Sequence, residues 1–255
     1  MTRVVACLAV MLLARAAAAE PFVRTEDRSP CAAYDPLRTP YFGDLHVHTA
    51  LSLDASTQGI RAMPEDAYRF AQGAPLGIAP FDPGGRPLRR LRLDRPLDFV
   101  AVTDHAELFG EQEICSDPAH PQYGALVCVL YRRWPRLAFF IMNGFVSRSD
   151  PPQRFGFCGP DGSACSAAAR TPWRRIRDAA EAAYDRSPAC RFTSFVGYEW
   201  TGAPGGFNLH RNVVFRNAAV PELPVSYVDE PDADGLWRRL AADCRGAIAG
   251  CDFLT

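Results

Sequence analysis

The segment "YFGDLHVHTALSLDA", from Tyr41 to Ala55, places three polar residues on alternate positions of a predicted strand: Asp44, His46 and His48. Side chains of a strand alternate between its two faces, so all three share one face, opposite Leu45 and Val47. We expect this strand to lie in the interior, where a polar stripe is costly unless it is satisfied. Imidazole and carboxylate groups are metal ligands, so the pattern favours a metal site.

Further groups of the same kind follow the other predicted strands. They are Asp54, Asp104, His105, Glu199 and His210. Together with His46 and His48, the set includes four of the five histidines of the chain. Each alone has an ordinary structural explanation, such as a cap, a surface loop or a satisfied core histidine. Functional groups of parallel barrels gather at the carboxyl ends of strands, so we expect these side chains to converge on divalent ions such as zinc, manganese or iron.

Four residues are candidates for roles beside metal binding. Glu199 has two oxygens and can bridge two ions. Asp44 and Asp104 are expected to orient imidazoles, and Arg211 is a candidate for substrate contact, although packing explains it equally well. We therefore name Glu199, Asp104 and Arg211 as candidate catalytic residues.

The elements that must position these groups alternate between strands and helices. Strands are predicted at 41–48, 99–102, 192–200 and 205–216, with another beginning near Cys251, and a hairpin at 77–93. Helices are predicted at 63–73, 171–187 and 233–246, the second with Thr171 as cap and Pro172 as first residue. This order predicts a parallel α/β architecture, a barrel, with an irregular cysteine-rich insertion at about 110–170.

Residues 1–19 have the pattern of a secretory signal peptide, so we expect a periplasmic or secreted protein. The eight later cysteines then favour disulfides over a zinc site, and Cys115–Cys128 and Cys158–Cys165 are the predicted local pairs. The apolar run 125–145 contains three arginines and a proline, which indicates buried elements around a turn and no membrane span. The formal charge of −1 gives no reason to expect a nucleic-acid partner.

The motifs "DLHVHT", "VTDHAE", "GYEW" and "NLHRN", in this order, resemble the polymerase and histidinol phosphatase (PHP) superfamily of metallohydrolases. The sequence around these motifs is most similar to an exported bacterial branch classed as domain of unknown function 3604. The resemblance implies a distorted seven-stranded barrel with two or three metal ions. It assigns His46 and His48 to the first ion, Glu199 to a bridge, His210 to the second ion, and Asp54 with His105 to the third.

The family pattern also supplies a histidine and an Asp-x-His further along, and these have no counterpart here. We therefore expect residues 20–255 to be the N-terminal part of a longer PHP-like domain. On this expectation the barrel is incomplete because its C-terminal strands are missing, and the fragment is inactive or holds an incomplete cluster.

The expected chemistry is hydrolysis of a small molecule, a phosphoester by resemblance, using metal-activated hydroxide. An amidohydrolase acting on amides or lactones is one alternative. It is weakened because all 28 basic residues are arginine, so no carboxylated lysine can bridge the ions. A non-catalytic exported metal-binding module is the other alternative. Neither nucleic acid nor a membrane is an expected partner once the signal peptide is removed.

Overall fold

The computed structural model describes residues 28–35, 39–204 and 207–255; the predicted signal peptide lies outside this range. The strands are β1 (Gly43–Val47), β2 (Leu76–Phe81), β3 (Pro87–Leu91), β4 (Phe99–Val102), β5 (Thr193–Gly202), β6 (Leu209–Phe215) and β7 (Phe253–Leu254). The helices are α1 (Leu53–Thr57), α2 (Pro64–Ala71), α3 (Phe109–Ser116), α4 (Leu126–Arg133), α5 (Pro135–Arg148), α6 (Ser163–Ala183) and α7 (Ala233–Leu240). Short helical turns are η1 (Gly156–Cys158) and η3 (Ala241–Gly246).

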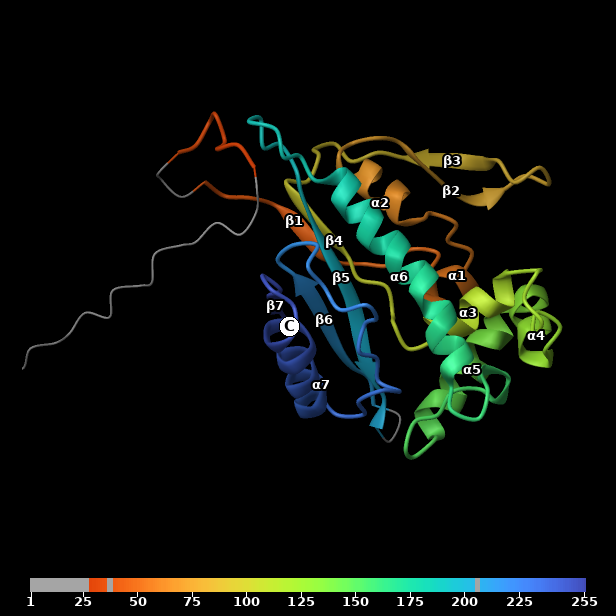
Figure 1. Cartoon of the computed structure of the whole chain (residues 1–255). Helices are drawn as coiled ribbons and strands as arrows, with labels where there is room; N and C mark the ends of the chain where they lie inside the picture. The colour runs from red at the N-terminus through yellow and green to blue at the C-terminus, as the bar shows by residue number, and fades with distance from the viewer. Residues whose placement is uncertain (1–27, 36–38, 205–206) are drawn as a thin grey trace, which may run out of the picture.

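Five strands form one mixed sheet in the order β1-β4-β5-β6-β7 (Figure 1). The pairs β1–β4 and β4–β5 are parallel, as predicted, whereas β5–β6 and β6–β7 are antiparallel. The expectation of an all-parallel sheet is therefore wrong at β6 and β7. The connection from β5 to β6 is short, and strands joined by a short connection must run antiparallel because a parallel crossover needs a dozen residues or more.

The sheet is open among the described residues and does not close into a barrel, so the predicted barrel, which was expected to be incomplete, is not confirmed. It is nevertheless curled. Asn212 of β6 donates from Nδ2 to the carbonyl oxygen of Leu45 in β1 at 3.0 Å, although β1 and β6 are not neighbours in the sheet. This contact brings the first strand close to the strand that carries His210.

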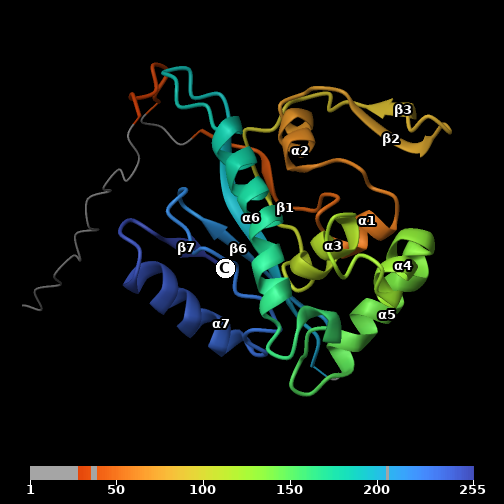
Figure 2. The ribbon, with the colours of Figure 1, turned by 45° about the vertical axis from the view of Figure 1, so that its right-hand side comes forward.

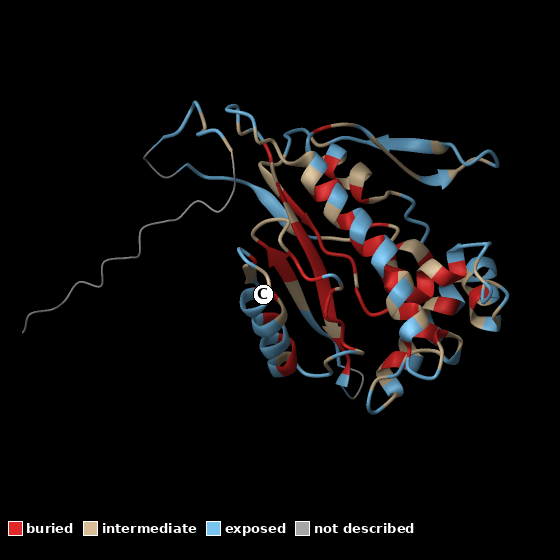
Figure 3. Ribbon diagram, in the orientation of Figure 1, coloured by how far each residue is buried: buried red, intermediate tan, exposed pale blue. Residues whose placement is uncertain are grey.

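The position of β1 also differs from the prediction. It is an edge strand of the sheet, with Asp44 and His46 exposed, and not an interior strand. The continuous apolar run of β4 is buried as expected, with Val100, Ala101 and Val102 almost fully covered, and β5 is buried beside it (Figure 3). The sheet thus has a buried centre and a partly exposed edge strand, β1, which carries the predicted ligand His46.

Helix α6 crosses the sheet over β4 and β5, with α2 and α3 packed beside it (Figures 1 and 2). It begins at Ser163, after Gly162 in the left-handed conformation, so the predicted start at Thr171 is wrong. Pro172 lies inside the helix, where it costs a hydrogen bond. The buried stripe continues across the proline through Ala169, Trp173 and Ile176, and this packing favours one continuous helix.

The remaining predicted helices are confirmed. Pro64 is at the start of α2, and α7 continues into a π-helical turn that ends at Gly246. The hairpin of β2 and β3 is confirmed as well, with a mostly exposed second strand. Helices α2 and α7 each have a buried face in the main core, which includes Tyr68, Leu236 and Leu240.

The predicted irregular insertion is mostly helical. It contains α3, α4, α5, η1 and the first turns of α6. The apolar run 125–145 forms two helices that meet at Trp134, but Leu126, Leu137 and Phe140 are at least half exposed. The expectation that this run is buried throughout is therefore wrong. No described helix combines the length and the apolar character that crossing a membrane requires.

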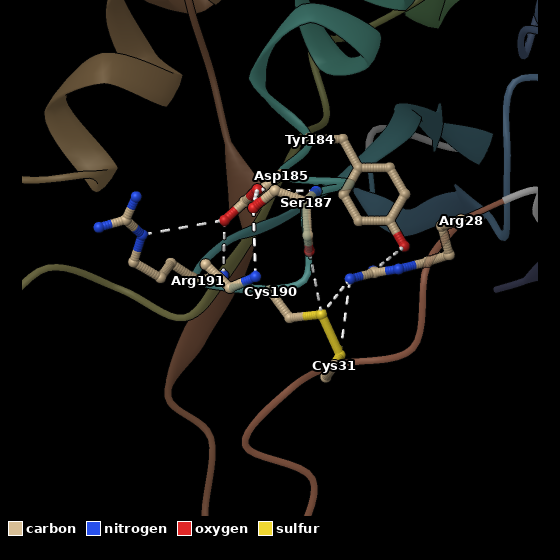
Figure 4. Close-up of a disulfide and its surroundings, with 8 residues drawn as sticks. Arg28, Cys31, Tyr184, Asp185, Ser187, Cys190 and Arg191 are labelled. Atoms are coloured by element: carbon tan, nitrogen blue, oxygen red, sulfur yellow. Dashed lines mark hydrogen bonds and ion pairs between the residues drawn. A yellow bond between two sulfur atoms is a disulfide. The ribbon is translucent and has the colours of Figure 1, made fainter.

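Four disulfides connect the eight cysteines that follow the predicted signal peptide. The predicted pairs Cys115–Cys128 and Cys158–Cys165 are confirmed, and both lie in a small core beside α3. Cys244–Cys251 closes the turn between η3 and β7. Cys31–Cys190 joins the N-terminal segment to the loop after α6, where Arg28 lies against its sulfurs and against Tyr184 (Figure 4).

The hydroxyl of Tyr68 connects the two central strands. It donates to the carbonyl oxygen of Phe195 at 3.0 Å and accepts from the amide of Val102 at 3.3 Å. We predict that Tyr68→Phe lowers the free energy of unfolding by about 1–3 kcal/mol, because it leaves buried backbone groups without a partner. Urea denaturation measures this change. Tyr34→Phe, at an exposed tyrosine, is the control, and equal unfolding curves for the two variants would contradict the prediction.

Candidate metal centre

Four separate segments bring the predicted ligands to one edge of the sheet. β1 and the residue directly after it supply His46 and His48, the residues directly after β4 supply His105, β5 supplies Glu199, and β6 supplies His210. The parallel strands β1, β4 and β5 end on this side, and the main chain of His105 pairs with that of Glu199 in an isolated parallel β-bridge. β6 returns in the opposite direction with His210 opposite Thr201, so its ligand reaches the same edge.

The carboxylate of Glu199 is at the centre of the cluster and is fully buried. Its Oε2 lies 3.0 Å from Nε2 of His46 and 2.8 Å from Nε2 of His48. Its Oε1 contacts Nδ1 of His210 and accepts a hydrogen bond from the hydroxyl of Thr201 at 3.1 Å. The two oxygens therefore face two different groups of ligands, as a bridging carboxylate must.

His48 is held between two carboxylates. Its Nδ1 lies 3.0 Å from Oδ2 of Asp54, and its Nε2 faces Glu199. Asp54 is the second residue of α1 and is oriented by the hydroxyl of Ser52, which donates to Oδ1 at 2.6 Å. His105 completes this side of the cluster, with its Nε2 3.9 Å from Oδ2 of Asp54.

The proximity of these groups changes their ionisation. Burial alone would lower the pKa of His48, but hydrogen bonds to Asp54 and Glu199 outweigh burial and raise the pKa to about 10. Burial alone would raise the pKa of Glu199, but the hydrogen bond of His48 and the charges of the histidines lower it to about 2. Burial lowers the pKa of His105 to about 4, so this imidazole is neutral at pH 7.

Three overlapping sets of donor atoms fit divalent ions. The sets are His46–His48–Glu199, His48–Asp54–His105 and His105–Glu199–His210, and the donors of each set lie within 4.8 Å of one another. A neutral imidazole has a single N–H, so His48 cannot donate to two carboxylates without an additional proton. A cation can replace that proton, and nitrogen and carboxylate donors suit zinc, manganese and iron. The donor set therefore fits two or three adjacent ions.

The two aspartates expected to orient imidazoles bind the main chain. Buried Asp104 accepts from the amide of Thr49 and, at 2.7 Å, from its hydroxyl, and burial raises its pKa to about 6. Asp44 accepts from the amide of His46 at 2.9 Å. The expected contacts with imidazoles are therefore wrong: Asp104 fixes the backbone immediately after His48 because Thr49 offers it two donors.

Arg211 is not brought into the cluster. It follows His210 in β6, so strand alternation directs it to the other face, where its guanidinium donates to the carbonyl oxygen of His210 at 2.8 Å. Its predicted contact with substrate has no support in the geometry of the described residues. Alternation along β6 already separates Arg211 from His210.

Two residues of the site were not identified from the sequence. The hydroxyl of Thr201 lies 2.8 Å from Nδ1 of His105 and 3.2 Å from Nδ1 of His210, in addition to its bond with Glu199. Glu107 accepts from the amide of Thr201 at 2.7 Å, and burial raises its pKa to about 8. Thr201 is two residues after Glu199, so the two-residue period of β5 places both side chains on one face. This spacing is the sequence signal from which Thr201 could have been identified.

A pocket of about 430 Å³ opens beside the cluster. Asp54, His105 and His210 form its metal-facing end, and α5 forms another wall. The site thus combines candidate ligands with a space of the size that small molecules occupy.

The family model described as "Protein of unknown function (DUF3604)" matches residues 35–255. The chain belongs to this family. No curated protein and no solved structure matches it. Every candidate ligand of this DUF3604 protein lies within the matched residues, so the candidate metal centre is part of the family domain.

The pKa of His48 leads to a prediction for metal binding. A proton and a metal ion compete for its nitrogens, so a pKa raised to about 10 weakens metal binding at neutral pH. We predict that the apparent affinity for zinc increases about tenfold per pH unit between about pH 7 and 9, with release of a proton. Titration calorimetry in buffers of different protonation enthalpy measures that proton.

His48→Ala removes the competing group and should reduce both the zinc stoichiometry and the proton release. His120→Ala is the matched control, because His120 lies outside the cluster and its Nδ1 accepts from the amide of Gln122. An affinity that does not change between pH 7 and 9 in the unaltered protein would contradict the assignment.

Proposed function

We propose that the protein, in its full-length form, is an exported, metal-dependent hydrolase of the PHP superfamily that cleaves phosphate esters. The observation that carries this proposal is that neighbouring donor sets share ligands: His48, His105 and Glu199 each belong to two of the three sets. Shared ligands hold ions next to one another, and adjacent divalent ions activate water and clamp the oxygens of a phosphoryl group. The four disulfides are typical of exported proteins and support a periplasmic or secreted location.

Different residues of the chain would bind the ions and orient the ligands. His46, His48, Asp54, His105 and His210 would hold the ions, and Glu199 would bridge them. Thr201, held by Glu107, keeps the imidazoles of His105 and His210 oriented. In the hydrolysis, the oxygen of water bonds to phosphorus, the ester P–O bond breaks, and the leaving alcohol takes up the proton that water loses.

Glu199→Gln tests the proposal because it preserves shape while it removes the charge that bridges the ions. We expect metal content to decrease and hydrolysis of p-nitrophenyl phosphate by the metal-loaded protein to decrease by about 100-fold or more, at least the loss that removal of an outer-shell partner causes. Metal analysis and a colorimetric assay with zinc, manganese or iron measure these effects. Glu222→Gln, at an exposed ion pair with Arg170, is the matched control.

The same assay distinguishes the alternatives. Cleavage of amides or lactones without cleavage of phosphate esters would favour an amidohydrolase. Bound metal with no hydrolysis of any of these substrates would favour a non-catalytic metal-binding module. A protein that binds no zinc, manganese or iron would overturn the proposal.

A further inference from the structure

The pocket beside the metal centre has a wall that the metal-binding motifs do not predict. Helix α5 contributes Phe139, Asn143, Val146 and Ser147 to it, and the end of α1 contributes Gln58. α5 packs against α1, so these side chains line the same space as His105 and His210. The helix therefore faces the space that a compound would occupy with its reacting group at the candidate metal centre.

Asn143 and Ser147 are one helical turn apart, so they project on the same side of α5. Both are partly buried, and neither side chain has a hydrogen-bond partner among the described residues. Gln58 and Asn208 offer two further carboxamides at the same pocket, also without a partner in the described part of the chain. A pocket lined by uncommitted amides and a hydroxyl offers both donors and acceptors to a ligand.

The charges at the pocket exclude one class of ligand. Asp54 and Glu107 are its acidic residues, and no arginine lines it among the described residues. The chain has no lysine. A second anionic group on the substrate would find no cationic side chain there and would lie near carboxylates. The apolar surfaces of Phe139 and Val146 suit the carbon face of an uncharged organic group.

We propose that this pocket binds the organic part of the substrate, and that Asn143 and Ser147 hydrogen-bond to its hydroxyl groups. The substrate class is a phosphate monoester of a neutral, hydroxyl-bearing compound of about the size of a sugar. This inference rests on the proposed hydrolase function. Asn143 and Ser147 act on affinity and positioning, whereas the cluster around Glu199 carries the chemistry.

The test compares three substrates of the metal-loaded protein: a hexose 1-phosphate, p-nitrophenyl phosphate, which has no hydroxyl group, and a hexose bisphosphate. We expect the lowest KM for the hexose 1-phosphate. Asn143→Leu should raise that KM about tenfold, the equivalent of 1.4 kcal/mol, and should raise it more than the KM for p-nitrophenyl phosphate. Ser147→Leu should have the same direction of effect.

Arg136→Leu is the control on the exposed side of α5, and it should not change either KM. Equal KM values for the hexose 1-phosphate in Asn143→Leu and Arg136→Leu would overturn the inference and leave the hydrolase proposal intact. The inference would also be overturned, with the hydrolase proposal intact, if Asn143→Leu raised the KM of all substrates equally. A lower KM for the hexose bisphosphate than for the hexose 1-phosphate would have the same meaning.

Calorimetric titration of each phosphate into the metal-loaded protein separates binding from turnover. Binding of the hexose 1-phosphate that Asn143→Leu weakens, without any hydrolysis, would support the pocket and overturn the hydrolase. No binding of the hexose 1-phosphate would overturn the pocket inference, whatever the rate with p-nitrophenyl phosphate.

Discussion

The structure of the site depends on one buried carboxylate. Glu199 has no exposed surface, and an unpaired charge in such a position is strongly unfavourable. Three imidazoles and a hydroxyl contact its two oxygens, and they come from β1 and the residue after it, from β5 and from β6. The positions of these strands are therefore linked to the charge of one side chain, and a cation at the cluster would strengthen that link.

The mixed direction of the sheet explains how so many ligands reach one edge. Parallel β1, β4 and β5 direct their carboxyl ends to it, while antiparallel β6 enters the same edge from its amino end. His210, the second residue of β6, therefore meets Glu199, near the end of β5. A purely parallel arrangement would have placed the ligands of β6 at the end of that strand, near Phe215.

The helices between β4 and β5 give the site its walls. Two disulfides and a small core hold α3, α4 and the start of α6 together. α5 packs against α1, whose second residue is the candidate ligand Asp54. The cysteine-rich segment thus has a direct relation to the pocket: one face of α5 lines the space into which the candidate metal centre opens.

Much of the site could be predicted from the sequence by itself. The alternation of His46 and His48, the placement of Asp54, His105, Glu199 and His210 beside strands, and two of the disulfides follow from local patterns, because side-chain direction in a strand has a fixed period. The partners of the polar groups do not follow from such patterns. Asp104 binds Thr49 and not an imidazole, and Thr201 contacts three members of the cluster.

Tertiary structure alone decided the direction of β6, the edge position of β1, the start of α6 at Ser163 and the assignment of Asn143 to the pocket. Each of these depends on contacts between segments that are distant in the sequence. Packing of Trp173 and Ile176 outweighs the local preference of Pro172 for a helix start, because burial of a long apolar stripe contributes more free energy than one lost hydrogen bond.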